Sequence, residues 1–242
     1  MLKSVNHKTL PQFAWTINGL SQESIEDIHT SALNLLGHTG IKVEDNPRAL
    51  DIFYGGGCLI EKHKDYGIAK IPSGVVEDCL QKAPRNLKVH GRNNDSCYEF
   101  KMGQVTFTPF GEQIQIIDPE TRRIRKTTQK DVAEITRLCD HFHQVGVVQR
   151  MVAALDKPAG THPVFNAQAM FENTGKHILI GPVDAEKFQV IADIAMAHVG
   201  GRDNFAKRPI FTTLTCPTDP FRLEKNCADL IIESALLEGG GI

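Results

Sequence analysis

The sequence predicts an α/β protein, a partial (β/α) barrel of the TIM type that is preceded by a small α+β layer. From Gln104 onward, short apolar runs alternate with amphipathic stretches, an order typical of parallel strands joined by helices. The runs are apolar on both faces, as expected for strands that are covered on both sides. No Gly-x-Gly-x-x-Gly follows any of them, which disfavours an open dinucleotide-binding sheet. We therefore assign residues 1–103 to the layer and residues 104–242 to the barrel.

The barrel is expected to be incomplete. A full barrel takes about 250 residues, so only about three to four of its eight units fit after Gln104. The chain ends in Glu-Gly-Gly-Gly-Ile, where an αβ loop would lead to a further strand. Leu230 and Ile231 would then face a missing neighbour, and we expect them to pack on a partner chain or to be poorly ordered.

Three helices are predicted in the N-terminal layer. Ser21 caps the first, whose apolar positions recur at helical spacing until Gly37 ends it. Asn46 followed by Pro47 begins the second, which stops at a run of three glycines. The third runs from Pro72-Ser73 to Ala83-Pro84, with Val75, Val76, Cys79 and Leu80 expected to point inward.

Strands are predicted between these helices. Residues 40–43 form a short strand after the first helix. Residues 58–60 and 68–71 are expected to pair as a hairpin across a polar loop. The first part of the chain is therefore interpreted as an α+β layer of its own.

The barrel begins with a β-branched and aromatic run, residues 105–108, that stops at Pro109. A second strand covers residues 113–117, and Thr128 with Asp131 forms a capping box that begins a helix. After it, the pattern predicts strands at 145–152, 178–181 and 209–215, with helices at 163–173, at 184–198 and from Asp219-Pro220 onward.

Composition excludes several classes of function. The chain is 41% hydrophobic and 23% charged with a net charge of −2, so it lacks the basic stripe of a nucleic-acid or membrane-surface protein. No apolar run is long enough to span a bilayer, and Met1 to Phe13 has no apolar signal core, so we expect a cytoplasmic protein. The six cysteines include no Cys-x-x-Cys pair, and neither a zinc site nor a disulfide scaffold is indicated.

Candidate site residues follow the predicted strands, because the carboxyl ends of the strands carry function in a barrel. Glu112 lies beside Phe110 just past a strand, and an acid next to an aromatic face suits a cation; the alternative is a solvated loop charge. Asp156 and Cys216 also follow strands, although Cys216 could equally be a buried, idle thiol. Gln149, inside an apolar run, faces either the barrel interior or the helices, where it would be a satisfied core amide.

Four stretches carry a resemblance, namely residues 28–43, 71–84, 118–125 and 172–177. The order of these four stretches along the chain resembles that in the trimethylamine and glycine betaine corrinoid methyltransferase family. The resemblance implies a barrel enzyme that moves a methyl group from a methylated or quaternary amine to the cobalt of a corrinoid. The corrinoid (cobalamin) would be supplied on a partner protein, without a tightly bound metal in this chain.

On this resemblance, Glu112 becomes the candidate catalytic residue, and the candidate substrate-binding residues are Phe110, Gln149, Asp156 and Cys216. Lys176 and His177 belong to the last of the four stretches but precede their strand, so we expect them to be structural. A homo-oligomer is expected. Two alternatives remain open: a non-catalytic half-barrel binding or scaffold module that dimerises, and another barrel enzyme such as a lyase or hydrolase.

Overall fold

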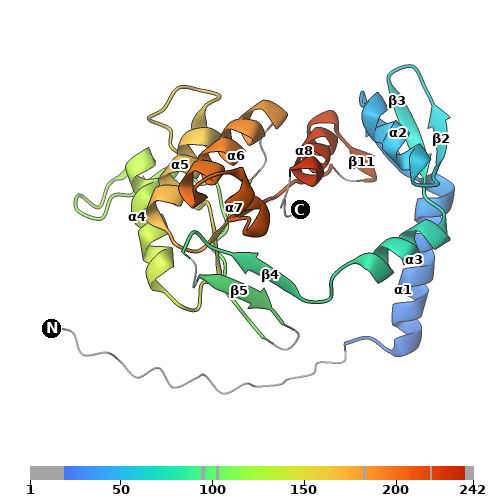
Figure 1. Ribbon diagram of the computed structural model, residues 1–242, viewed down its shortest axis with the longest axis horizontal. Helices are drawn as coiled ribbons and strands as arrows, with labels where there is room; N and C mark the ends of the chain where they lie inside the picture. The colour runs from blue at the N-terminus through green and yellow to red at the C-terminus, as the bar shows by residue number, and fades with distance from the viewer. Residues whose placement is uncertain (1–18, 94–95, 102–103, 182–183, 219, 238–242) are drawn as a thin grey trace.

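The computed structural model describes residues 19–93, 96–101, 104–181, 184–218 and 220–237. Figure 1 shows an N-terminal layer, coloured blue to cyan, beside a larger α/β body, coloured yellow-green to orange. A green hairpin lies between them along the chain.

The layer contains α1 (Gln22–Asn34), the π-helical turn η1 (Leu35–Thr39), β1 (Ile41–Glu44), α2 (Pro47–Gly55), β2 (Leu59–Lys62), β3 (Tyr66–Lys70) and α3 (Ser73–Lys82). The predicted caps are confirmed, because Ser21 Oγ accepts from the Ser24 amide and Asn46 Oδ1 from the Ala49 amide. The predicted hairpin is confirmed as the antiparallel pair β2 and β3.

The first helix does not end at Gly37 as predicted. It continues through η1 to Gly40, whose φ is 75° and whose amide donates to the carbonyl of Leu35 at 3.0 Å. A Cβ added to Gly40 would lie 2.6 Å from the Ala69 carbonyl oxygen, whereas one added to Gly37 would meet only the Ile71 carbonyl oxygen at 3.7 Å. The prediction was wrong because the close approach of β3 requires the glycine at 40, which the local pattern does not reveal.

The apolar face of α3 is not buried, contrary to prediction. None of its residues is buried, and Leu80 is 57% exposed. Val75, Val76 and Cys79 instead line an open apolar groove of about 880 Å³ between α3 and α2. Helix α1 has no buried residue either.

Residues from the far end of the chain complete the layer. The strand β11 (Arg222–Leu223) pairs in parallel with β1, which gives the sheet order β11-β1-β3-β2. Helix α8 (Lys225–Leu236) follows and packs on the layer, where Ala228 and Ile232 join a small core with Val43 and Leu50. Figure 1 shows α8 and β11 in red next to the blue and cyan elements.

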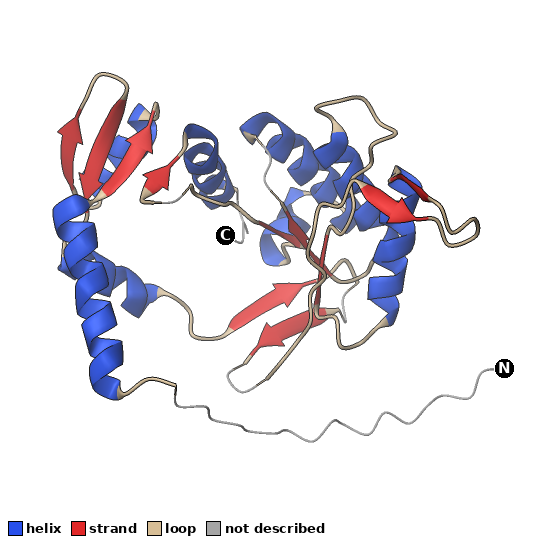
Figure 2. Cartoon of the chain, turned by 180° about the vertical axis from the view of Figure 1, so that it is seen from behind, coloured by secondary structure: helices blue, strands red, loops and turns tan. Residues whose placement is uncertain are grey.

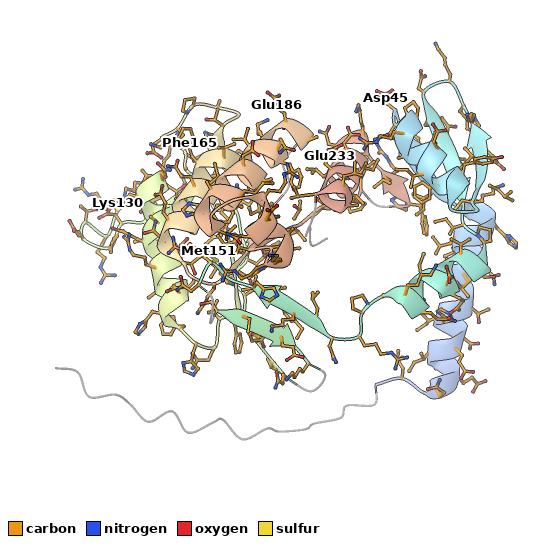
Figure 3. All side chains as sticks on the ribbon, viewed as in Figure 1. Asp45, Lys130, Met151, Phe165, Glu186 and Glu233 are labelled. Carbon is orange, nitrogen blue, oxygen red and sulfur yellow. The ribbon has the colours of Figure 1, made fainter. Side chains whose placement is uncertain are left out.

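The start of this last helix was predicted wrongly. It begins at Lys225 with Glu224 at its N-cap, because Arg222 and Leu223 are used in β11. Asp219, the predicted cap, lies outside the described residues. Figure 3 labels Glu233 on α8, which pairs with Arg48 Nη1 of α2 at 2.7 Å.

Leu230 of α8 is 1% exposed and packs in the main hydrophobic core. The expectation that it faces a missing neighbour was therefore wrong, since α8 turns this side chain toward its own chain. Ile231 is half-buried.

The body is built on three parallel strands, β8 (Val147–Gln149), β9 (His177–Ile180) and β10 (Phe211–Thr213), in the order β10-β9-β8. Its helices are α4 (Gln129–His141), α5 (His162–Asn173), α6 (Ala185–Val199) and the unpredicted α7 (Arg202–Lys207). Figure 2 shows these strands from behind, with helices gathered along one side. The capping box at Thr128 and Asp131 is confirmed at the start of α4.

One face of the parallel sheet packs against the helices. Val148, Ile178 and Phe211 lie on that face, within a cluster that includes Met170, Ile191 and other residues of α5 and α6. Because side chains alternate along a strand, Val147, Gln149 and Leu179 lie on the opposite face, which we call the inner face.

The segment before the hairpin β6 (Gln115–Ile117) and β7 (Ile124–Lys126) runs along the free side of β8. Phe107 forms a parallel bridge with Val145, and Gln113 forms one with Val152. The strand predicted at 105–108 is thus reduced to a single bridge, and Phe107 is 61% exposed.

The hairpin of β4 (Leu87–His90) and β5 (Cys97–Phe100) covers the inner face near the amino ends of the strands. His177 donates through Nδ1 to the His90 carbonyl at 2.8 Å, and its Nε2 accepts from the Thr212 hydroxyl at 2.8 Å. Lys176 Nζ donates to the carbonyls of Cys139 and Phe142. The structural roles predicted for Lys176 and His177 are therefore confirmed.

Candidate active site

Three segments meet at the carboxyl ends of the parallel strands. Glu112 belongs to the segment beside β8, Arg150 directly follows β8, and Gly181 directly follows β9. The segment of Glu112 is fixed by backbone hydrogen bonds, from the Gln113 amide to the Met151 carbonyl at 3.0 Å and from the Ala153 amide to the Gln113 carbonyl at 3.1 Å. This end of a (β/α) sheet is where function is concentrated in barrel enzymes.

Glu112 forms an ion pair with Arg150 through its Oε1 and the Nη2 of the guanidinium. The Glu112 side chain is 54% exposed, while that of Arg150 is only 11% exposed. A Cβ added to Gly181 would lie 2.7 Å from Oε1 of Glu112 and 3.7 Å from Nη2 of Arg150. Gly181 follows Leu179 by two residues, so a side chain at position 181 would point to the inner face. The Glu112 carboxylate occupies that space and therefore lies on the inner face at the carboxyl ends of the strands.

Arg150 was not selected from the sequence. Its burial lowers the pKa of the guanidinium from its ordinary value, and its Nε is buried with no hydrogen-bond partner among the described residues. A buried donor without a partner is unfavourable by about 1–3 kcal/mol. The available signal was a charged residue placed immediately after a buried apolar strand, at the end that carries function.

Gln149 is the residue before Arg150, and its side chain lies on the inner face. It is 6% exposed and is in register with Leu179, which is in turn paired with Thr212. Ligand binding by Gln149 stays a prediction. The strand turns it away from the helices.

Phe110 and Asp156 differ in their surroundings. The Phe110 ring is 74% exposed, two residues before Glu112. Asp156 accepts a hydrogen bond from the Gln129 amide at 2.7 Å, at the first turn of α4, and so stabilises the start of that helix. Ligand binding by either residue stays a prediction.

Cys216 lies apart from the ion pair, in an open cavity of about 420 Å³ after β10. Asp184, Lys187 and Cys227 share this cavity, and Cys227 Sγ donates to the Cys216 carbonyl at 3.5 Å. Burial raises the pKa of the Cys227 thiol. Asp184 caps α6, because it accepts a hydrogen bond from the Lys187 amide at 2.9 Å at the start of the helix.

Within the described part of the chain, no three His, Cys, Asp or Glu side chains are grouped so that they could hold a metal ion. None of the described helices has both the length and the apolar character needed to cross a membrane.

Comparison with known proteins gives consistent matches. Residues 3–237 match the family model described as trimethylamine methyltransferase (MTTB). The chain is 41% identical over 218 residues to the trimethylamine methyltransferase MttB of Desulfitobacterium hafniense, covering 90% of this chain and 43% of the relative. It is 31% identical over 225 residues to MttB of Methanosarcina barkeri, covering 90% and 45%. A glycine betaine methyltransferase of Desulfitobacterium hafniense is 24% identical over 211 residues, covering 86% and 42%. The chain thus spans less than half the length of these relatives.

Proposed function

Because the chain belongs to the trimethylamine methyltransferase family, we propose that it takes part in methyl transfer from a methylated or quaternary amine to the cobalt of a corrinoid held by a partner protein. The family match over residues 3–237 supports this activity. The chain covers 43% and 45% of two of these relatives, so the activity of the whole protein is part of this proposal.

In this reaction the C–N bond of the amine breaks and a Co–C bond forms. Cobalt(I) supplies the electron pair of the new bond, and the pair of the old bond stays on nitrogen, so a quaternary amine leaves as a neutral tertiary amine. For a quaternary amine no proton has to move, whereas trimethylamine has to react as trimethylammonium so that it leaves as neutral dimethylamine. The protein has to hold the cation in line with the cobalt and to exclude water, which is catalysis by positioning.

Glu112 is the residue that we assign to the cation. A quaternary ammonium has no N–H group to donate, so it is recognised by carboxylates and aromatic faces. The observation that carries the proposal is the position of the Glu112 carboxylate, half exposed at the top of the inner face beside Gly181. Phe110 is the candidate aromatic residue nearest to Glu112 in the sequence. Gln149 is the candidate polar residue on the inner face.

We further propose that β8, β9 and β10 are consecutive strands of a (β/α) barrel. Their parallel pairing in sequential order, with helices between them, supports this assignment. The parallel bridges of Phe107 and Gln113 would add the strand before β8. The inner face would then line the barrel interior.

The second candidate is the dimerising scaffold, and exposed apolar residues of α1 and η1 favour it. Ile25 and Ile28 of α1 are 47% and 58% exposed, and Leu35 of η1 is 45% exposed. Sedimentation velocity at several concentrations separates the two functions when it is combined with a methyl-transfer assay. A dimer without any methyl transfer would favour the scaffold.

The proposed activity is tested by anaerobic incubation of the chain with cob(I)alamin and trimethylamine, glycine betaine or carnitine, with methylcobalamin followed by its absorbance. We expect formation with at least one amine and at least about a tenfold lower rate for Glu112→Gln. The control is Glu134→Gln, an exposed carboxylate paired with Lys130 on α4. Equal rates for Glu112→Gln and the control would remove Glu112 from the site.

A further inference from the structure

Two thiols from different parts of the fold share the open cavity after β10. Cys216 lies in the segment that follows β10, and Cys227 lies in the first turn of α8. Cys227 Sγ donates to the Cys216 carbonyl oxygen at 3.5 Å, so the Cα atoms of the two residues are less than about 9 Å apart. A disulfide spans about 4.4–6.8 Å between its Cα atoms. The two cysteines are therefore close enough to be joined by a small movement of the loop between them.

The two thiols differ in their access to solvent. Cys216 is exposed, whereas Cys227 is only 8% exposed, and burial raises the pKa of the Cys227 thiol. Exposure, rather than a neighbouring cation, distinguishes the two thiols, because Lys187 of the same cavity is paired with Asp184. An oxidant in solution therefore reaches Cys216 first.

We propose that Cys216 and Cys227 form a reversible oxidation site, in which Cys216 reacts with a peroxide and Cys227 converts the product to a disulfide. The observation that carries this inference is the juxtaposition of an exposed and a buried thiol in one cavity. An accessible thiol with a second thiol beside it is the arrangement that favours a disulfide over further oxidation of the first sulfur. The inference does not depend on the proposed methyl transfer.

The chemistry balances with hydrogen peroxide as the oxidant. The Cys216 thiolate attacks one peroxide oxygen, the O–O bond breaks, and the sulfur keeps that oxygen as a sulfenic acid. The hydroxide that leaves takes up the proton of the Cys216 thiol and becomes water. The Cys227 sulfur then attacks the sulfenic sulfur, the S–O bond breaks, and the second hydroxide takes up the Cys227 proton. The two thiols have then lost two electrons to the peroxide, and a reducing thiol restores them.

The disulfide would link the segment after β10 to the first turn of α8. The ten residues between the two cysteines include β11, which pairs with β1 of the N-terminal layer. A disulfide stabilises the folded chain mainly by constraining the unfolded one. We therefore expect oxidation to raise Tm by about 3 °C or more in scanning calorimetry.

Disulfide mapping on the full chain tests the inference. The protein is treated with hydrogen peroxide, its remaining thiols are alkylated, and a non-reducing digest is analysed by mass spectrometry. We expect a peptide that joins Cys216 to Cys227 and that is lost when the oxidised chain is reduced with dithiothreitol. The absence of this peptide would overturn the inference, whether Cys216 stays reduced, is oxidised alone, or is left unpaired while Cys58 joins Cys79 in the groove between α2 and α3.

Single substitutions separate the roles of the two thiols. In Cys216→Ser, the buried Cys227 should be oxidised at least about tenfold more slowly than in the wild-type chain. In Cys227→Ser, the reaction at Cys216 should stop at the sulfenic acid, which dimedone traps, and Tm should no longer rise on oxidation.

The matched control is Cys97→Ser, which removes an exposed thiol of β5. This variant should keep both the linked peptide and the rise in Tm. Equal rates of Cys227 oxidation in Cys216→Ser and the wild-type chain would contradict the order of the two steps. If a variant does not fold, the disulfide map of the wild-type chain still decides.

Discussion

The carboxylate of Glu112 occupies the space that a side chain at position 181 would need. A Cβ added to Gly181 would lie 2.7 Å from Oε1 of Glu112. The two residues are far apart in sequence, and the parallel strands bring them together at their carboxyl ends. The ion pair with Arg150 is formed in this space, so the position of Glu112 depends on the glycine.

Gly181→Ala should therefore displace the Glu112 carboxylate at little cost in stability, because the atom that must move is the end of a flexible side chain. We expect the affinity for glycine betaine to fall by about tenfold and the free energy of unfolding to change by less than about 1 kcal/mol. Titration calorimetry and urea denaturation measure the two quantities. Gly74→Ala, where an added Cβ has nothing within 4 Å, is the control. Unchanged affinity in Gly181→Ala would mean that the carboxylate has no part in binding.

Arg125 connects the β6–β7 hairpin to the start of α4. Its guanidinium makes bonds of 2.7 and 2.8 Å to the two oxygens of Asp131, whose side chain is only 5% exposed. Hydrogen bonding to Arg125 lowers the pKa of Asp131 to about 2. Arg125→Met would leave a buried carboxylate without its partner, and we expect Tm to fall by about 5 °C or more in scanning calorimetry.

The control for Arg125 is Lys130→Met. Lys130, labelled in Figure 3, is 81% exposed and pairs with Glu134 at 3.6 Å. Exposed pairs of this kind contribute little to stability, so Tm should change by about 1 °C or less. Equal losses for the two variants would show that the hairpin does not depend on the buried carboxylate.

His177 should make stability depend on pH. Burial lowers its pKa to about 4, from an ordinary value near 6.5 in the unfolded chain. Below 6.5 the unfolded chain takes up a proton that the folded chain does not, so the free energy of unfolding falls as pH decreases from 6.5 to 4. The loss over this window is about 3 kcal/mol for a shift of this size.

Urea denaturation at half-unit steps of pH measures this effect. In His177→Asn the slope between pH 6.5 and 4 should be reduced, although the variant is less stable throughout because the bonds to His90 and Thr212 change. His141→Asn, an exposed histidine at the end of α4, is the control and should keep the wild-type slope. A wild-type slope in His177→Asn would assign the pH dependence to other groups.

Substitution of two glycines, Gly37 and Gly40, tests where the first helical segment ends. Gly40→Ala places a Cβ against the backbone of Ala69 at a φ of 75°, and we expect a loss of at least about 2 kcal/mol. Gly37→Ala makes only an ordinary contact and should be neutral or slightly stabilising, because alanine favours helix. Urea denaturation of both variants measures the difference, and a reversed order would place the end of the segment at Gly37.

Local chemistry explains which elements were predictable. The caps at Ser21, Asn46 and Thr128 depend on neighbouring residues only, and each was found from the sequence. The end at Gly40 depends on the approach of Ala69, and β11 depends on pairing with β1 from the other end of the chain. Such contacts between distant segments leave little local signal.

For the same reason, the sequence predicted Glu112 of the candidate site but not Arg150 and Gly181, which lie next to it. Glu112 was selected because it follows an apolar run, and the structure brings it to Arg150 and Gly181. Arg150 carried only the weak signal of a charged residue after a buried strand, and Gly181 only that of a glycine after a strand, and both patterns are common. Gln149 was selected, but only the register of β8 with β9 assigns it to the inner face. Cys216 follows its strand as predicted, yet it lies in a separate cavity.

The most direct test of the central claim is to locate a bound ligand by anomalous scattering. Arsenobetaine and tetramethylarsonium replace the quaternary nitrogen by arsenic, whose X-ray absorption edge marks the position of the cation in a crystal. We predict a single strong arsenic peak beside the Glu112 carboxylate. An arsenic peak in the Cys216 cavity, or none on the inner face of the sheet, would contradict the account.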